Sequence, residues 1–292
     1  MKFAAIDVGS NAIRLLLARV FEHENEPFIK KESLVRMPIR LGDDAFLRKS
    51  IPEEKIRQVS KTMIAFKYLM DAYEPLDYMA CATSAMREAE NSDRIIAEIT
   101  KDCGLKLEII DGKKEAHIIF STHIADRLDP DMAYLYIDVG GGSTELTLFH
   151  KNEPVEERSF NIGTIRLLND LVTKKYWTEV KRWTKEQCSK YNKISAIGSG
   201  GNINKIFRLS GKKENSPLSY KKLVEISQSI HQYSFEERIY RLGLRPDRAD
   251  VILPAANIFT SVMRWGNIKQ IYVPQIGLAD GLVHILYQRY KS

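Results

Sequence analysis

The stretch IDVGGGSTE at residues 137–145 decides the fold, because a shorter version of it, IDVGSN, stands at residues 6–11. Each copy follows a short apolar run and precedes another, at residues 13–20 and 146–149. A strand, an acid near its end, a glycine turn and a second strand predict a β-hairpin. An internal repeat constrains the whole architecture, so two hairpins predict two similar domains with a phosphate held between them.

Each hairpin tip has the chemistry of an anion site. Glycines let the backbone approach a ligand closely, and successive N–H groups form a concave site for an anion. One such tip alone is more typical of an ordinary hairpin turn, but two copies with added hydroxyl and amide groups favour anion binding. We therefore expect phosphate contacts at Gly9, Ser10, Asn11, Gly140, Gly141, Gly142 and Ser143.

Carboxylates flank both tips. Asp7 and Asp138 would repel a phosphate unless a hard cation such as Mg²⁺ lies between them, or unless they orient a water. Glu145, just past the second tip, is consistent with a metal ligand, a base or a surface strand residue. The sequence predicts metal ligands at Asp7, Asp138 and Glu145.

A third glycine cluster, residues 198–201, stands between an apolar strand and a helix, where N–H groups and the helix dipole favour an anion. It has neither the ending of a P-loop nor the third glycine of a dinucleotide fingerprint. Arginine suits bidentate contact with phosphate, although a single cation is more often a solvated side chain. Further phosphate contacts are therefore predicted at Arg14, Arg166, Gly198, Ser199, Gly200 and Gly201.

Cys81 and Arg87 have the spacing with which thiol phosphatases cradle a phosphoryl group. Such a thiol needs a depressed pKa and nearby donors, but no His precedes it and the loop holds no glycine. We therefore interpret Cys81 as a buried residue ending a strand, and expect Thr83, Ser84 and Arg87 to bind phosphate without it.

Glu115 begins a helix after a glycine. An acid there commonly interacts with the helix dipole. It acts as a general base for water if burial near other carboxylates raises its pKa.

Bulk properties limit the function classes. The 292 residues allow one large or two ordinary domains, and the net charge of +6 suits a polyanionic substrate or a solvated basic surface. No apolar run approaches a membrane helix and no secretory signal is visible. Three scattered cysteines argue against disulfides and a cysteine zinc site, and favour a cytoplasmic location. Aromatic residues are dispersed, so we expect no sequence-specific nucleic-acid binding.

Strands alternate with helices in both halves, which predicts an α/β fold with mixed sheets. We expect an N-terminal α/β domain over residues 1–124 and a C-terminal one over residues 125–292. Whether the last helix, at residues 278–292, packs on the first domain is left open.

Eight segments resemble, in order, the exopolyphosphatase/guanosine pentaphosphate phosphohydrolase family of the actin-like ATPase and sugar-kinase superfamily. They are AAIDVGSNAIRLLLA, CATSAMREAENSD, IIDGKKEAHIIF, YIDVGGGSTELTLF, NIGTIRLL, AIGSGGNINKIF, LRPDRADVILPAANIF and IGLADGLVHILY. The resemblance implies two related ribonuclease H-like domains of the actin-like ATPase fold, with the active site in the cleft. It also implies a cytoplasmic homodimer that uses Mg²⁺, with Mn²⁺ or a monovalent cation as alternatives.

The resemblance also assigns roles. Glu115 matches the proposed base, Asp138 and Glu145 match residues that bind metal or activate water, and Arg87 matches an arginine that contacts phosphate. Ala12 and Asn202 depart from the Ser and Thr that are common in the family. The chain also lacks the long C-terminal helical extensions of larger members, so processivity on long polyphosphate is not implied.

These observations predict a hydrolase that releases terminal orthophosphate from inorganic polyphosphate. The alternatives are a phosphohydrolase acting on pppGpp, an ATP-binding kinase or switch, and a non-catalytic sensor of polyphosphate or of a guanosine penta- or tetraphosphate alarmone.

Overall fold

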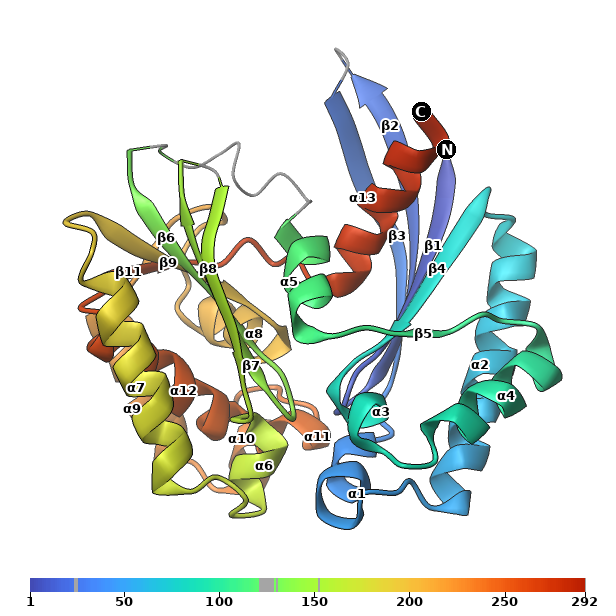
Figure 1. Cartoon of the computed structure of the whole chain (residues 1–292), viewed down its shortest axis with the longest axis horizontal. Helices are drawn as coiled ribbons and strands as arrows, with labels where there is room; N and C mark the ends of the chain where they lie inside the picture. Colours follow the sequence, from blue (N-terminus) through green and yellow to red (C-terminus); the bar gives the residue numbers. More distant parts are fainter. Residues whose placement is uncertain (24–25, 121–128, 130, 152, 292) are drawn as a thin grey trace. The chain divides into compact units, whose positions relative to one another are not determined.

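A computed structural model of the chain describes residues 1–23, 26–120, 129, 131–151 and 153–291. The chain divides into two compact units, of which unit 1 is Met1–Thr122 with Gly277–Ser292 and unit 2 is His123–Ile276. Each unit contains one mixed β-sheet covered by helices (Figure 1). The α/β class and the mixed sheets predicted from the sequence are confirmed.

Unit 1 is built on a five-stranded sheet in the order β3-β2-β1-β4-β5. The first three strands are antiparallel, whereas β4 runs parallel to β1 and β5 parallel to β4. This is the ribonuclease H-like order. The central strand β1 is almost wholly buried, which explains its continuous apolar sequence. The strands are β1 (Lys2–Val8), β2 (Ile13–His23), β3 (Glu26–Met37), β4 (Asp77–Ala82) and β5 (Glu108–Ile109).

Helices cover both faces of this sheet: α5 and α13 lie on one face, and α2 and α4 on the other (Figure 1). The last helix, α13, therefore belongs to unit 1, where it contacts β1, β2, β4 and α5. Gly281 of α13 packs so closely on α5 that a Cβ atom would lie 2.1 Å from the Ile118 carbonyl oxygen. The helices are α1 (Leu41–Arg48), α2 (Glu53–Tyr73), α3 (Ser84–Glu88), α4 (Ser92–Cys103), α5 (Gly112–Phe120) and α13 (Leu278–Lys291).

Unit 2 repeats the plan with a six-stranded sheet in the order β10-β11-β9-β6-β7-β8. Strands β6, β7 and β8 are antiparallel, whereas β9 runs parallel to β6 and β11 parallel to β9. The edge strand β8 is polar and mostly exposed, which discourages pairing with another sheet. The strands are β6 (Ala133–Val139), β7 (Thr144–His150), β8 (Glu153–Phe160), β9 (Ile194–Ser199), β10 (Leu218–Ser219) and β11 (Gln270–Tyr272).

Helix α12 lies at the centre of the unit 2 core, where it contacts α6, α7, α8, α9 and β6. No helix in the described ranges is both long and apolar enough to cross a bilayer. The helices of this unit are α6 (Thr164–Leu168), α7 (Lys174–Cys188), α8 (Gly201–Leu209), α9 (Tyr220–His231), α10 (Phe235–Tyr240), α11 (Pro246–Ala249) and α12 (Ile252–Trp265).

The two predicted hairpins have the same register, which positions equivalent residues at both tips. Asp7 faces Arg14 across β1 and β2, and Asp138 faces Glu145 across β6 and β7. Each turn closes with an equivalent bond, from Gly9 N–H to the Ala12 carbonyl (3.1 Å) and from Gly140 N–H to the Ser143 carbonyl (3.0 Å). The repeat in the sequence is thus a repeat in the structure.

Candidate active site

The second tip, residues 140–143, presents its N–H groups on one side because its carbonyls are held on the other. The Gly140 and Gly141 carbonyls accept from the first backbone N–H groups of α6 (3.0 and 2.9 Å), and Arg166 Nε donates to the Gly142 carbonyl (2.7 Å). In a trans peptide the carbonyl and the following N–H point in opposite directions. The N–H groups of residues 141–143 therefore face away from α6, as an anion site requires.

The first tip, residues 9–12, is held in the same manner by the segment before α1. The Ser10 carbonyl accepts from Gly42 N–H (2.9 Å) and the Asn11 carbonyl from Arg40 N–H (3.2 Å). The hydroxyls of Ser10 and Ser84 share a hydrogen bond (2.8 Å), and both side chains are buried. Within the described residues, nothing accepts from the N–H groups of Ser10, Gly141 or Gly142.

The acid pair of unit 2 fits a hard cation. Asp138 and Glu145 face each other across antiparallel strands, so their side chains lie on the same face, and they are 9% and 4% exposed. The hydroxyls of Ser143 and Ser159 donate to Oε1 of Glu145 (2.6 and 3.1 Å), which fixes the orientation of that carboxylate. Two buried carboxylates that face each other repel, and a divalent cation bound by both removes the repulsion.

In the equivalent pair of unit 1, the positive charge beside the acid comes from an arginine side chain. Arg14 faces Asp7 and donates from Nη1 to Oδ2 of that carboxylate. Asp7 thus fits a metal ligand less well than Asp138, and Arg14 is engaged with an acid as well as being a candidate for phosphate. No group of three or more acid, His or Cys side chains in the described part of the chain is placed to hold a metal. An ion on the Asp138–Glu145 pair would complete its shell with water and phosphate oxygens, as Mg²⁺ commonly does.

The third glycine cluster adjoins the acid pair. Ser199 lies beside Asp138 in the parallel register of β9 and β6. Gly200 has φ +105°, a conformation that favours glycine. A Cβ atom there would lie 3.2 Å from the Val139 carbonyl oxygen, which is a tight contact, and 3.4 Å from Asp138 Oδ1. Over Gly201, at the first turn of α8, lies the guanidinium of Arg248, with Nη2 2.6 Å from the position of a Cβ atom.

Cations gather along α8, from Arg248 over its first turn to Arg208 in its last turn. Arg248 comes from α11, and Lys205 and Arg208 come from α8 itself. Burial lowers the pKa of Lys205, and the positive charges of Arg248 and Arg208 lower it further. The positive charges of this group repel one another, which disfavours the protonated form of Lys205. An anion bound among them would relieve that repulsion.

Two of the predicted arginines are engaged with the backbone. Arg166 is buried and anchors the second tip through the Gly142 carbonyl, and Arg87 Nη1 donates to the Ile110 carbonyl (2.6 Å). Their direct contact with phosphate stays a prediction. Arg166 also has a structural role, because its bond to the Gly142 carbonyl helps to orient the N–H groups of the second tip.

Cys81 does not have the properties of a nucleophile. Burial, together with the smaller effects of the Glu108, Asp7 and Glu115 charges, raises the pKa of its thiol to about 12. The thiolate is then nearly absent at neutral pH, whereas a catalytic cysteine needs a depressed pKa. Thr83, two residues on, is buried and its N–H donates to the Val8 carbonyl (3.1 Å).

We expect Cys81→Ser to leave phosphate release within about threefold of the unchanged protein, because a protonated thiol contributes no nucleophile. Parallel rate measurements before and after treatment with iodoacetamide check this without a substitution. Activity that needs no metal and disappears in the Ser variant would contradict it and restore the thiol mechanism.

Glu115 lies in the first turn of α5 and is half-buried. It belongs to the same acidic neighbourhood as Asp7 and Glu108, since all three act on the Cys81 thiol. Asp7, Cys81 and Glu108 stand at one level across β1, β4 and β5. The carboxyl ends of these parallel strands therefore gather the acids of unit 1 at one edge of its sheet.

The structure adds three contacts at the candidate site that the sequence does not predict. Ser84 bonds Ser10, Ser159 bonds Glu145, and Arg248 lies over Gly201. Ser84 is predicted from the sequence as a phosphate contact, together with Thr83 and Arg87, but its bond to Ser10 is not. Two helices, α9 and α10, lie between Gly201 and Arg248 in the chain. Arg248 is marked in the sequence only by its place in the segment LRPDRADVILPAANIF.

Comparison with known proteins identifies the family of the chain. A model of the Ppx/GppA phosphatase family matches residues 33–289, a range that holds Glu115, Asp138 and Glu145. A bifunctional 3-dehydroquinate synthase/phosphatase of Fusobacterium nucleatum is 30% identical over 284 residues, covering 89% of this chain and 43% of that protein. The chain thus spans less than half of that relative. Exopolyphosphatase 1 of Mycobacterium leprae is 22% identical, covering 97% of this chain and 88% of that protein.

Solved structures show the same fold. An exopolyphosphatase from Cytophaga hutchinsonii is 22% identical with a TM-score of 0.84, covering 99% of this chain and 98% of that one. An Aquifex aeolicus member of the Ppx/GppA family is 22% identical with a TM-score of 0.78, covering 100% and 99%.

Proposed function

Because the chain belongs to the Ppx/GppA phosphatase family, we propose that it is an exopolyphosphatase, which releases terminal orthophosphate from inorganic polyphosphate. The observation that carries this proposal is the second tip, where three backbone N–H groups face away from α6 beside the buried Asp138–Glu145 pair. Relatives named exopolyphosphatase, such as the one from Mycobacterium leprae, support this choice of substrate.

The metal that the family implies fits the acids of unit 2. Asp138 and Glu145 would hold Mg²⁺ between them, with Ser143 and Ser159 orienting Glu145. When bound, such an ion neutralises phosphate oxygens and supports in-line displacement. The tip N–H groups serve the same end, because they donate to oxygens on which charge gathers during phosphoryl transfer.

Glu115 is the proposed general base. Its carboxylate would take a proton from water as the water oxygen forms a bond to the terminal phosphorus. The bond from that phosphorus to the bridging oxygen breaks, and the shortened chain leaves with the electron pair. Phosphoryl transfer needs little covalent help from protein, so positioning and charge stabilisation supply most of the acceleration.

A phosphate-release assay tests the proposal, with medium-length polyphosphate and either Mg²⁺ or EDTA. We expect release with Mg²⁺ that EDTA abolishes. Guanosine pentaphosphate has the same kind of terminal anhydride, so it is assayed in parallel. Release from the nucleotide alone would reassign the substrate, and no release from either would overturn the proposal in favour of a binding or switch protein.

A further inference from the structure

Two adjoining cavities lie at the edge of the unit 2 sheet that is opposite to the glycine loops. Their volumes are about 760 and 350 Å³, and both are lined by Asn267 and Lys269, so they form one groove, which we call the basal groove. It is lined by residues at the starts of β9 and β11, the residue before β6, and parts of α7, α9 and α12. Since β6 spans seven residues, the groove lies about 20 Å from the second tip.

The lining of the basal groove is strongly basic. No Asp or Glu lines either cavity, and in the described part of the chain none of the lining cations forms an ion pair with an acid. Like charges around one hollow focus a positive potential there and raise the local concentration of anions. The five cations, all on exposed residues, are Lys185, Lys193, Lys221, Arg264 and Lys269.

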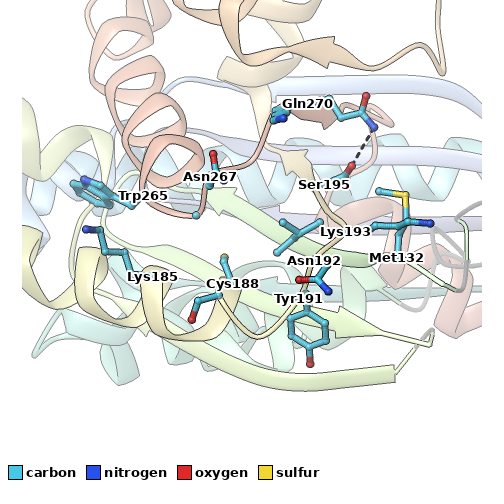
Figure 2. Close-up of a pocket in the computed structure, with 14 residues that line it drawn as sticks. Met132, Lys185, Cys188, Tyr191, Asn192, Lys193, Ser195, Trp265, Asn267 and Gln270 are labelled. Atoms are coloured by element: carbon cyan, nitrogen blue, oxygen red, sulfur yellow. Dashed lines mark hydrogen bonds between the residues drawn. The ribbon is translucent and has the colours of Figure 1, made fainter.

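The neutral part of the groove is held by its own bonds. Gln270 Nε2 donates to Ser195 Oγ (3.1 Å), as Figure 2 shows, and the Ser189 hydroxyl donates to the Glu186 carbonyl (3.0 Å). The side chains of Asn192 and Asn267 are exposed and add amide donors between the lysines. Neutral polar residues held by hydrogen bonds and surrounded by lysines suit an extended ligand that carries negative charge along its length.

The aromatic residues of the groove argue against a nucleic acid. Trp265 packs edge-on against Trp177, with ring centroids 5.8 Å apart, and Tyr191 packs against His150 at 5.0 Å. Single-stranded nucleic acids bind proteins through basic grooves that also offer aromatic faces on which bases stack. Trp265 and Tyr191 are half-buried and already packed against another ring. Tyr220, the third aromatic residue of the lining, is half-buried and packs against the hydrophobic core, so the groove offers mainly charge.

We propose that the basal groove is a second binding site, separate from the reacting phosphate, for a linear phosphate polyanion, namely inorganic polyphosphate. The preference for an anion rests on the groove alone, whereas the identity of this anion rests on the proposed function. A groove with five cations would hold a long chain and give little advantage to a short one, because a short anion contacts few of them at once.

A binding titration in EDTA tests the proposal without turnover. It compares long-chain polyphosphate with tripolyphosphate, using the unchanged protein and the double variant Lys193→Gln with Lys269→Gln. The matched control is Lys174→Gln with Lys175→Gln, which removes two exposed charges from α7 outside the groove. We expect the groove variant to bind the long chain about tenfold more weakly, with an effect that shrinks in high salt. We expect the control to change affinity by less than about twofold, and tripolyphosphate binding to be equal in all three proteins.

Equal weakening in the groove and control variants would overturn the proposal, because the effect would then be one of net charge. A single-stranded oligonucleotide that competes for the groove more strongly than polyphosphate would overturn it in favour of nucleic acid. Thermal unfolding of each variant checks that the fold is retained. The outcome is independent of catalysis, so a protein that binds long chains through these lysines and never releases phosphate would refute only the proposed function.

Discussion

Glu115→Gln should lower the turnover number for phosphate release by about 10²–10⁴, the contribution typical of a positioned general base. The substitution keeps the size and the hydrogen-bonding atoms of the side chain but removes its ability to take a proton from water. As the proposed base, Glu115 acts on the attacking water and not on the bound phosphate, so the KM should change little. Steady-state assays of phosphate release with Mg²⁺ give both constants.

The matched control is Glu108→Gln, which makes the same chemical change on a neighbouring acid of unit 1. Glu108 stands next to Cys81 in the sheet and forms an ion pair with Lys114 on the surface. Its loss should cost less than about threefold, as exposed ion pairs contribute little. Turnover of Glu115→Gln within about tenfold of the unchanged protein would show that another group accepts the proton.

The parts of the fold that could be predicted from the sequence are those with a local signal. The hairpin tips, the start of α2 after Pro52 and the end of α4 at Gly104 each follow from residues within one turn. Residues 247–265 form no single helix but belong to two, α11 and α12, because the chain departs from a regular helix at residues 250–251. Helices α1 and α3 have no such signal, because eight and five residues are too few for a helical repeat of apolar side chains to be recognised.

The candidate site also has some features with a local sequence signal and others without one. The acids and glycines of the tips are visible in the sequence because each tip is contiguous. The bonds that orient them are not, because they join residues far apart: Arg166 to the Gly142 carbonyl, Ser159 to Glu145, and Ser84 to Ser10. No periodicity or spacing encodes such contacts, and only the folded chain brings them together.

Gly163→Ala should damage the phosphate site as severely as the loss of a functional group, although Gly163 bears no side chain. A Cβ atom there would lie 2.3 Å from the Gly141 carbonyl oxygen and 2.5 Å from the Gly142 carbonyl carbon. Both neighbours are backbone atoms, so no side chain can turn away, and the tip itself must shift. The backbone of Gly163 is extended, with φ −139°, so alanine meets no other obstacle.

The shift would stretch the bonds that aim the tip, which run from Thr164 N–H to the Gly140 carbonyl and from Ile165 N–H to the Gly141 carbonyl. A displacement of about 1 Å at a reacting group costs roughly 10²-fold, so we expect kcat/KM to fall by about that factor. Overpacking should also lower the free energy of unfolding by about 1–3 kcal/mol. Gly277→Ala is the control, because a Cβ atom there meets nothing within 4 Å. Unchanged kcat/KM in a folded Gly163→Ala protein would show that the second tip does not hold the reacting phosphate, since the same displacement cannot spare a site that depends on the aim of its N–H groups.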